Sequence, residues 1–166
     1  MCSRIIDKLA CAANRLEAVL KIYLDACALN RLTDDQSQSR IHNEAEAVED
    51  IFHLISIGQI QWIASVVLDN EIRSNPNREK RLDALTLLSL AGELMRPNQK
   101  AVQRAVALEQ MGYGAYDAFH LACAEQAQVD AFLTTDDRLI RKAGRNLGNL
   151  TIRVLNPLKW LQEMQS

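Results

Sequence analysis

Apolar residues recur along the chain in two alternating patterns. Steps of three and four residues between apolar positions predict amphipathic helices, and short continuous apolar runs predict buried strands. Strand patterns occupy residues 21–24, 60–64, 130–134 and 151–155, with a weaker one at 94–96. Helical patterns occupy residues 40–57, 65–73, 78–91, 98–110, 116–127 and 138–145, with a last helix from Pro157 onward. This alternation predicts a parallel sheet flanked by helices.

The first twenty residues stand apart from this alternation. Apolar residues at helical spacing predict an amphipathic helix over residues 3–19, and the β-prone run that begins at Lys21 makes a natural domain start. We therefore predict an N-terminal helical extension, an appendage, over residues 1–20 and a single domain over 21–166, a length that suits one core. An ordinary packed first helix is the alternative.

Composition narrows the class of protein. Apolar residues make up 48% and charged residues 24% of the 166 positions, which excludes disordered and low-complexity chains. The net charge of -2 excludes a strongly basic protein that coats nucleic acid, although a local basic face remains open. The four cysteines form no CxxC pair, so we expect free thiols. No uncharged run approaches the length of a membrane span, and we expect a cytoplasmic protein without membrane association.

Acidic residues stand where the predicted strands end. Asp25 directly follows the first strand and Asp136 follows the third, and parallel sheets bind ligands at the carboxyl ends of their strands. Asp117 begins a helix and Glu71 follows the second strand by one helix, so we expect the four acids to converge. Because clustered carboxylates repel one another, a hard cation such as Mg²⁺ or Mn²⁺ is expected between them. Such sites hydrolyse phosphodiesters.

Each acid taken alone has an ordinary structural explanation. Asp25, Asp117 and either Asp136 or Asp137 fit helix N-caps, and Glu71 fits a solvated helix position. The combination favours a functional site, because aspartates that directly follow two apolar strands are less expected than scattered surface acids. Helix N-capping alone can nevertheless explain an aspartate at both Asp25 and Asp136.

Four segments of the chain resemble the motif blocks of PIN-domain proteins. They are IYLDACALNR at 22–31, IASVVLDNEI at 63–72, YDAFHLACAE at 116–125 and FLTTDDRLI at 132–140. Each block is short, but their order and spacing resemble the family's over most of the chain after residue 20. The resemblance implies an α/β fold, a three-layer Rossmann-like sandwich around a mainly parallel sheet. It also implies an acidic Mg²⁺ or Mn²⁺ site that cleaves RNA, and VapC-like toxins are the family's largest bacterial branch.

The resemblance also implies roles for the four acids. Asp25, Glu71, Asp117 and Asp136 match the family's acidic quartet. Asp25, Asp117 and Asp136 are the expected metal ligands, and Glu71 is expected to act through water.

Residues beside the quartet have supporting roles in this interpretation. Thr134 matches the hydroxyl residue before the last acid, and Asp137 is expected to support or replace Asp136, with register favouring Asp136. Cys27 departs from the Ser, Thr or Asn often found two places after the first aspartate, which puts a hydroxyl contact there in doubt. His120 lies one helical turn after Asp117, where it would reach a phosphate or the metal shell, although a structural histidine is the more frequent case.

Basic residues near the acids are candidates for contact with an RNA backbone. A solvated helix face is the comparable alternative for this set. The candidates are Arg31, Arg73, Arg138, Arg141, Lys142 and Arg145.

These observations predict a metal-dependent endoribonuclease that hydrolyses RNA phosphodiester bonds. From the resemblance we expect the toxin of a type II toxin-antitoxin pair, with a small antitoxin partner and a homodimer. The alternative is a catalytically inactive PIN-fold module that binds RNA or protein. A phosphatase of the haloacid-dehalogenase type needs a second aspartate where Cys27 stands, and a dinucleotide enzyme lacks its glycine-rich motif after the first strand.

Overall fold

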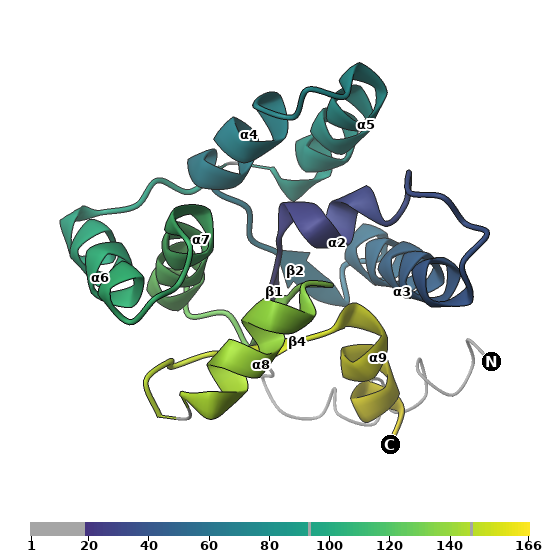
Figure 1. Ribbon diagram of the computed structural model, residues 1–166. Coiled ribbons are helices and arrows are strands. Elements are labelled where there is room, and N and C mark those ends of the chain that lie inside the picture. The colour runs from purple at the N-terminus through teal and green to yellow at the C-terminus, as the bar shows by residue number, and fades with distance from the viewer. Residues whose placement is uncertain (1–18, 93, 147) are drawn as a thin grey trace.

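The computed structural model describes residues 19–92, 94–146 and 148–166 (Figure 1). The elements are β1 (Leu20–Leu24), α2 (Ala26–Asn30), α3 (Ser39–Ser56), β2 (Ile60–Trp62), α4 (Val66–Arg73), α5 (Arg78–Leu88), the 3-10 turn η1 (Ser89–Ala91), α6 (Gln99–Gln110), α7 (Ala115–Gln126), β3 (Ala131–Leu133), α8 (Asp137–Arg145), β4 (Arg153–Leu155) and α9 (Pro157–Gln165). The predicted helix over 3–19 lies almost entirely outside the described residues, and the proposed 1–20 boundary remains a prediction. No helix within the described residues is long and apolar enough to cross a membrane.

Four parallel strands form one sheet in the order β2-β1-β3-β4. The register places Ile22 of β1 opposite Trp62 of β2 and Ala131 of β3. β1 is therefore paired along both edges, and its last three residues are fully buried. Because all four strands run in one direction, their carboxyl ends lie at a common edge of the sheet, which we call the carboxyl edge.

Helices cover both faces of the sheet, which confirms the predicted three-layer α/β architecture. Ile22 and Leu24 belong to an apolar cluster with α3 and α9, whereas Tyr23 between them belongs to a cluster with α6 and α7. This alternation follows from the extended backbone, in which successive side chains point to opposite faces. Figure 1 shows α6 and α7 on one side of the strands and α3 on the other.

Three segments differ from the sequence-based expectation. The strand expected at 94–96 is reduced to one bridge between Met95 and Ser65, and Pro97, which lacks a backbone N–H, follows closely. The helix expected over 78–91 ends at Leu88 and continues as η1. α2 was not predicted, because five residues are too few to show a helical pattern.

Candidate active site

Two neighbouring strands deliver Asp25 and Asp136 to the carboxyl edge. Leu24 and Leu133 are paired across β1 and β3, and the Asp25 N–H continues the ladder by donating to the Leu133 carbonyl at 3.2 Å. Asp136 follows β3 after two buried threonines. The strand pairing thus brings together two acids that are far apart in the sequence.

Asp25 is a buried carboxylate, only 4% exposed, at the N-terminus of α2. Its Oδ1 accepts the Ala28 N–H at 2.9 Å, so the N-cap interpretation of this residue describes one of its oxygens. Burial raises the pKa of the Asp25 carboxyl to about 7, although hydrogen bonds from Thr134 and Ala28 oppose the shift. Since a negative charge here is costly without a cation, the position suits metal binding.

Thr134 connects the two strand-end acids. Its hydroxyl accepts the Asp136 N–H at 3.0 Å, and its hydrogen bond to Asp25 lowers the pKa of that carboxyl. The side chain is fully buried, so its rotamer is fixed by these contacts. Thr134 therefore sets the position of Asp25 relative to Asp136.

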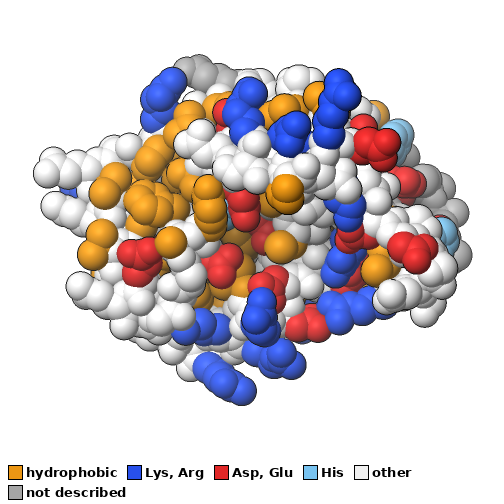
Figure 2. All heavy atoms as spheres, turned by 45° about the horizontal axis from the view of Figure 1, so that its top comes forward, with side chains coloured by type: hydrophobic (Ala, Val, Ile, Leu, Met, Phe, Trp, Pro, Cys, Tyr) orange, Lys and Arg blue, Asp and Glu red, His pale blue; other side chains and the backbone are white. Residues whose placement is uncertain are grey.

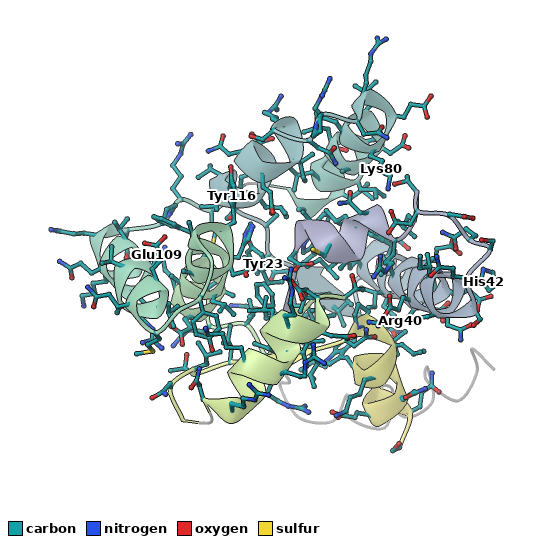
Figure 3. All side chains as sticks on the ribbon, viewed as in Figure 1. Tyr23, Arg40, His42, Lys80, Glu109 and Tyr116 are labelled. Atoms are coloured by element: carbon teal, nitrogen blue, oxygen red, sulfur yellow. The ribbon has the colours of Figure 1, made fainter. Side chains whose placement is uncertain are left out.

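Asp136 and Asp137 are adjacent in the sequence but have different partners. Asp136 is the N-cap of α8, and its Oδ1 accepts the Arg138 N–H at 2.8 Å. The Asp137 carboxylate makes a bidentate pair with Arg40 at 2.7 and 2.8 Å, and that guanidinium lowers the pKa of the Asp137 carboxyl. Figure 3 shows Arg40 near α9. The geometry thus occupies Asp137 with an ion pair and leaves Asp136 beside Thr134.

Asp117 reaches the site from the first turn of α7. The N-cap of this helix is Gly114, so the N-cap explanation of Asp117 is wrong. A Cβ built on Gly114 would lie 3.3 Å from Asp117 Oδ2, so the absence of a side chain there makes room for the carboxylate. Burial, followed by the negative charge of Asp136, raises the pKa of the Asp117 carboxyl.

Glu71 and His120 are joined by a hydrogen bond. Glu71 lies on α4 with its side chain 30% exposed, and its Oε2 is 2.7 Å from Nε2 of the buried His120. On its other side the imidazole contacts the Tyr23 hydroxyl at 2.7 Å. The structure therefore places His120 behind Glu71, held between two partners.

Cys27 lies on α2, two residues after Asp25, and is exposed at the surface. Desolvation raises the pKa of the Cys27 thiol, and the charges of Asp25, Glu71, Asp136 and Asp117 raise it further. A thiol so placed stays protonated and is a poor nucleophile. The negative charges of all four acids thus raise the pKa of the same thiol.

The hollow beside Cys27 is formed by α2, α4 and α5. Its volume is about 290 Å³, and it is lined by Ala26, Cys27, Asn30, Glu71, Ile72, Ser74, Asn75 and Ala84. Figure 2 shows acidic side chains gathered near the middle of one face, with Lys and Arg side chains along their border. The acids would repel an anionic ligand at this face unless a cation lay between the ligand and the carboxylates.

The donor chemistry of the acids fits a hard divalent cation. Every donor is a carboxylate oxygen, and burial raises the pKa values of Asp25 and Asp117, so that without a cation their charged forms are disfavoured. Over residues 19–92, 94–146 and 148–166, no three His, Cys, Asp or Glu side chains form a ready-made metal cluster. Mg²⁺ commonly binds through one or two carboxylates with water completing its shell, and this donor set suits that mode.

The basic residues predicted to contact RNA divide into two groups. Arg31 pairs with Asp34 and Glu44, Arg73 pairs with Asp69, and Lys142 binds the Gly112 carbonyl and lies 5.0 Å from the Tyr113 ring centroid. The other group consists of the three arginines of α8, which are exposed at the surface, and one of them, Arg138, has its Nε 3.8 Å from Asp136 Oδ1. It consists of Arg138, Arg141 and Arg145.

A second polar group, centred on Glu44, was not predicted from the sequence. Glu44, 3% exposed, accepts from Arg31 Nε at 2.6 Å, Arg40 Nε at 3.0 Å and Asn156 Nδ2 at 2.8 Å. The sequence does indicate that Glu44 is buried, because it stands four residues before Val48 and seven before Ile51, on the apolar stripe of α3. An acid on such a stripe indicates a buried partner.

Comparison with known proteins gives a family and a set of similar folds. The family model described as PIN domain matches residues 22–145. The structure of VapBC2 from Rickettsia felis, bound to a DNA fragment from its promoter, is similar with a TM-score of 0.52 and 13% identity, covering 82% of this chain and 100% of the other. VapBC-1 from nontypeable Haemophilus influenzae gives a TM-score of 0.55 and 14% identity, covering 83% and 98%. No curated protein sequence matches the chain.

Proposed function

The chain belongs to the PIN-domain family, and from this premise we propose that it is a metal-dependent endoribonuclease that hydrolyses RNA phosphodiester bonds in the cytoplasm. The observation that carries the proposal is the placement of Asp25 and Asp136 at the ends of two paired strands, where the Asp25 N–H bonds the Leu133 carbonyl and the Asp136 N–H bonds the Thr134 hydroxyl. In this proposal Asp117 of α7 and Glu71 of α4 complete an acidic set at the carboxyl edge, where parallel α/β sheets bind their ligands. An inactive binding module has no need for this uncompensated charge.

Asp25, Asp117 and Asp136 are the residues that would hold Mg²⁺ or Mn²⁺. When bound, such an ion lowers the pKa of a water molecule and stabilises negative charge on the scissile phosphate. Thr134 holds the Asp25 carboxylate in place, and Gly114 leaves space for that of Asp117. Glu71 has its Oε2 bound to His120, so it offers Oε1 as the acceptor for a proton of the attacking water.

The exposed arginines of α8 would bind the RNA backbone. Arg138 is 89% exposed, and its Nε is 3.8 Å from Asp136 Oδ1, so its guanidinium lies in solvent beside the acids. Arg141 and Arg145 extend the same exposed helix. Guanidinium groups bind phosphate oxygens and set the register of a nucleic acid without reading its sequence. We propose a single-stranded substrate, since flexible strands reach a recessed site most easily.

A small antitoxin is the proposed partner. Both similar structures carry VapBC names, and one was bound to promoter DNA, which supports a role in a toxin-antitoxin pair. An apolar groove of about 360 Å³ at α4 and α7, lined in part by Val67, Tyr116 and Phe119, offers a surface for a protein partner. Co-purification with the product of a neighbouring gene tests the pair, and light scattering of the chain alone tests the expected homodimer.

Cleavage of end-labelled single-stranded RNA tests the activity. We expect cutting with Mg²⁺ or Mn²⁺, none with EDTA, and loss of cutting in Asp117→Asn. The matched control is Asp50→Asn, an exposed acid on α3, which should cut like the wild type. Equal cutting by all preparations indicates a contaminating nuclease. No cutting by any, without stabilisation by metal, would favour the binding module.

A further inference from the structure

A row of four polar side chains runs behind the acidic edge, from Glu71 on α4 through His120 on α7 and Tyr23 on β1 to Ser65, the N-cap of α4. Glu71 Oε2 is 2.7 Å from His120 Nε2, His120 Nδ1 is 2.7 Å from the Tyr23 hydroxyl, and that hydroxyl is 2.7 Å from Ser65 Oγ. His120 is 2% exposed, and Tyr23 and Ser65 are completely buried. Polar groups this deep in an apolar cluster are costly unless each one is paired. The row therefore has a strong preference for a single arrangement.

The chemistry of the Glu71 end gives the hydrogen bonds a direction. At the Ser65 end the Leu68 N–H donates to Oγ at 3.2 Å, which leaves the Ser65 hydrogen free to be donated to Tyr23. A carboxylate oxygen accepts, so in the bond to Glu71 the hydrogen is on His120 Nε2. In the neutral imidazole, Nδ1 then accepts from the Tyr23 hydroxyl, which in turn accepts from Ser65. Every donor has an acceptor, and no cation needs to be buried.

Ring contacts hold the imidazole in this orientation. Tyr116 stacks on His120 with centroids 6.2 Å apart, and Tyr23 stacks on Phe132 at 5.3 Å with planes 8° apart. Figure 3 shows Tyr23 in the interior, between α7 and α2. The donor that reaches Glu71 is therefore attached to a rigid group, whereas Glu71 itself has a long side chain with several rotamers. A fixed donor restricts where that carboxylate can go.

We propose that His120 is a positioning residue that donates from Nε2 to Glu71 and so fixes the glutamate at the carboxyl edge, with Tyr23 and Ser65 fixing the imidazole from behind. The effect of His120 on catalysis rests on the proposed ribonuclease function, whereas the hydrogen bond between His120 and Glu71 does not depend on it. Holding Oε2 directs Oε1 toward the water that Glu71 is proposed to deprotonate.

Two substitutions of His120 separate positioning from packing. A glutamine amide nitrogen reaches the place of Nε2 and can still donate to Glu71, whereas an asparagine amide is too short and stays near Nδ1. For His120→Asn we expect kcat to fall about 10–100-fold with KM little changed, the range seen for loss of outer-shell partners. His120→Gln should recover most of kcat. If both variants lose thermal stability alike and keep wild-type kcat per folded molecule, His120 is only structural and the proposal fails.

Nitrogen-15 NMR of the full chain tests the hydrogen bond without any activity. We expect a single His120 tautomer with the hydrogen on Nε2, whose proton and nitrogen shifts move in Glu71→Gln. The control Asp69→Asn removes an acid from the same helix that pairs with Arg73, and it should leave His120 unchanged. A hydrogen on Nδ1, or equal shifts in both variants, overturns the proposal. If the wild type cuts no RNA, the ribonuclease proposal fails, and these spectra still decide whether His120 holds Glu71.

Discussion

Asp25 and Asp137 lie at the same edge of one sheet, yet their carboxyl pKa values are shifted in opposite directions. Asp25 is buried without an ion pair among the described residues, and its pKa is raised to about 7. Asp137 is exposed and paired with Arg40, which lowers its pKa. The same contrast separates Asp117 from Asp34, which is held by Arg31 and Lys80.

The contrast distinguishes acids whose charged form stabilises the fold from acids whose charged form destabilises it. Arg31 and Arg40 both pair with Glu44, within the same region, and neither pairs with Asp25 or Asp117. A chain selected only for stability would not bury carboxylates without an oppositely charged partner. Uncompensated charge is expected where a ligand supplies the missing cation.

The largest expected effect is an opposite change of activity and stability in Asp25→Asn. Cleavage should fall at least about 1000-fold, because a lost metal ligand removes several kcal/mol of transition-state stabilisation. The unfolding free energy near pH 7.5 should rise, since asparagine keeps the N-cap bond and carries no charge. Cleavage rates and urea denaturation measure both, and a variant that is inactive because it is less stable would contradict the contrast.

The next effect is a decline in the stability of the metal-free protein as pH rises from about 4 to 7. Folded Asp25 keeps its proton up to about pH 7, whereas the unfolded carboxyl releases it near 3.8. The folded state therefore binds more protons in this window, and the unfolding free energy falls by at most roughly 4 kcal/mol across it. Denaturation in EDTA at a series of pH values should give a steeper decline for wild type than for Asp25→Asn. Parallel curves would show that Asp25 is not the cause.

A smaller effect, on the unfolding free energy, is expected when an ion-paired acid is removed. Glu44→Ala should destabilise the fold by about 3 kcal/mol, because it leaves Arg31 and Asn156 without their buried acceptor. Glu46→Ala, an exposed residue of the same helix, should cost less than about 0.5 kcal/mol. Chemical denaturation measures the unfolding free energy of the two variants. Equal losses would show that the ion pairs of Glu44 do not stabilise the fold.

The smallest effect is expected for Asp137→Asn. Loss of the exposed pair with Arg40 should cost about 0.5–1 kcal/mol and less at high salt. Cleavage should stay within a few-fold of wild type, whereas Asp136→Asn should lose it. If Asp137→Asn folds normally and cuts nothing, then Asp137 is the ligand and Asp136 the cap.

The sequence predicted the elements that depend on local pattern and on parallel topology. Strand patterns ended at Asp25 and near Asp136, and a parallel sheet must place such ends at one edge, so the layered fold followed. The helix and strand boundaries agree to within a few residues. α2 was missed because one turn of helix carries no periodicity.

Long-range polar partners were beyond the sequence. Tyr23 looked like an ordinary β-prone residue, and nothing local shows that its hydroxyl meets a histidine 97 positions away. Arg73 and Arg31 were predicted to contact RNA, but each has an acid four or three residues away, at Asp69 and Asp34. That helical spacing was readable and favours local ion pairs.

The strand order has a consequence for synthesis. β1 is the first strand of the sheet to leave the ribosome, but it lies between β2 and β3, and β3 arrives only after most of the chain. At about 5–20 residues per second, Asp25 waits roughly 10 s before the segment with Asp136 has been translated. A nascent or truncated chain therefore holds at most part of the acidic set. For a protein proposed to cut RNA, this order of assembly keeps each new copy inert until its translation is nearly complete.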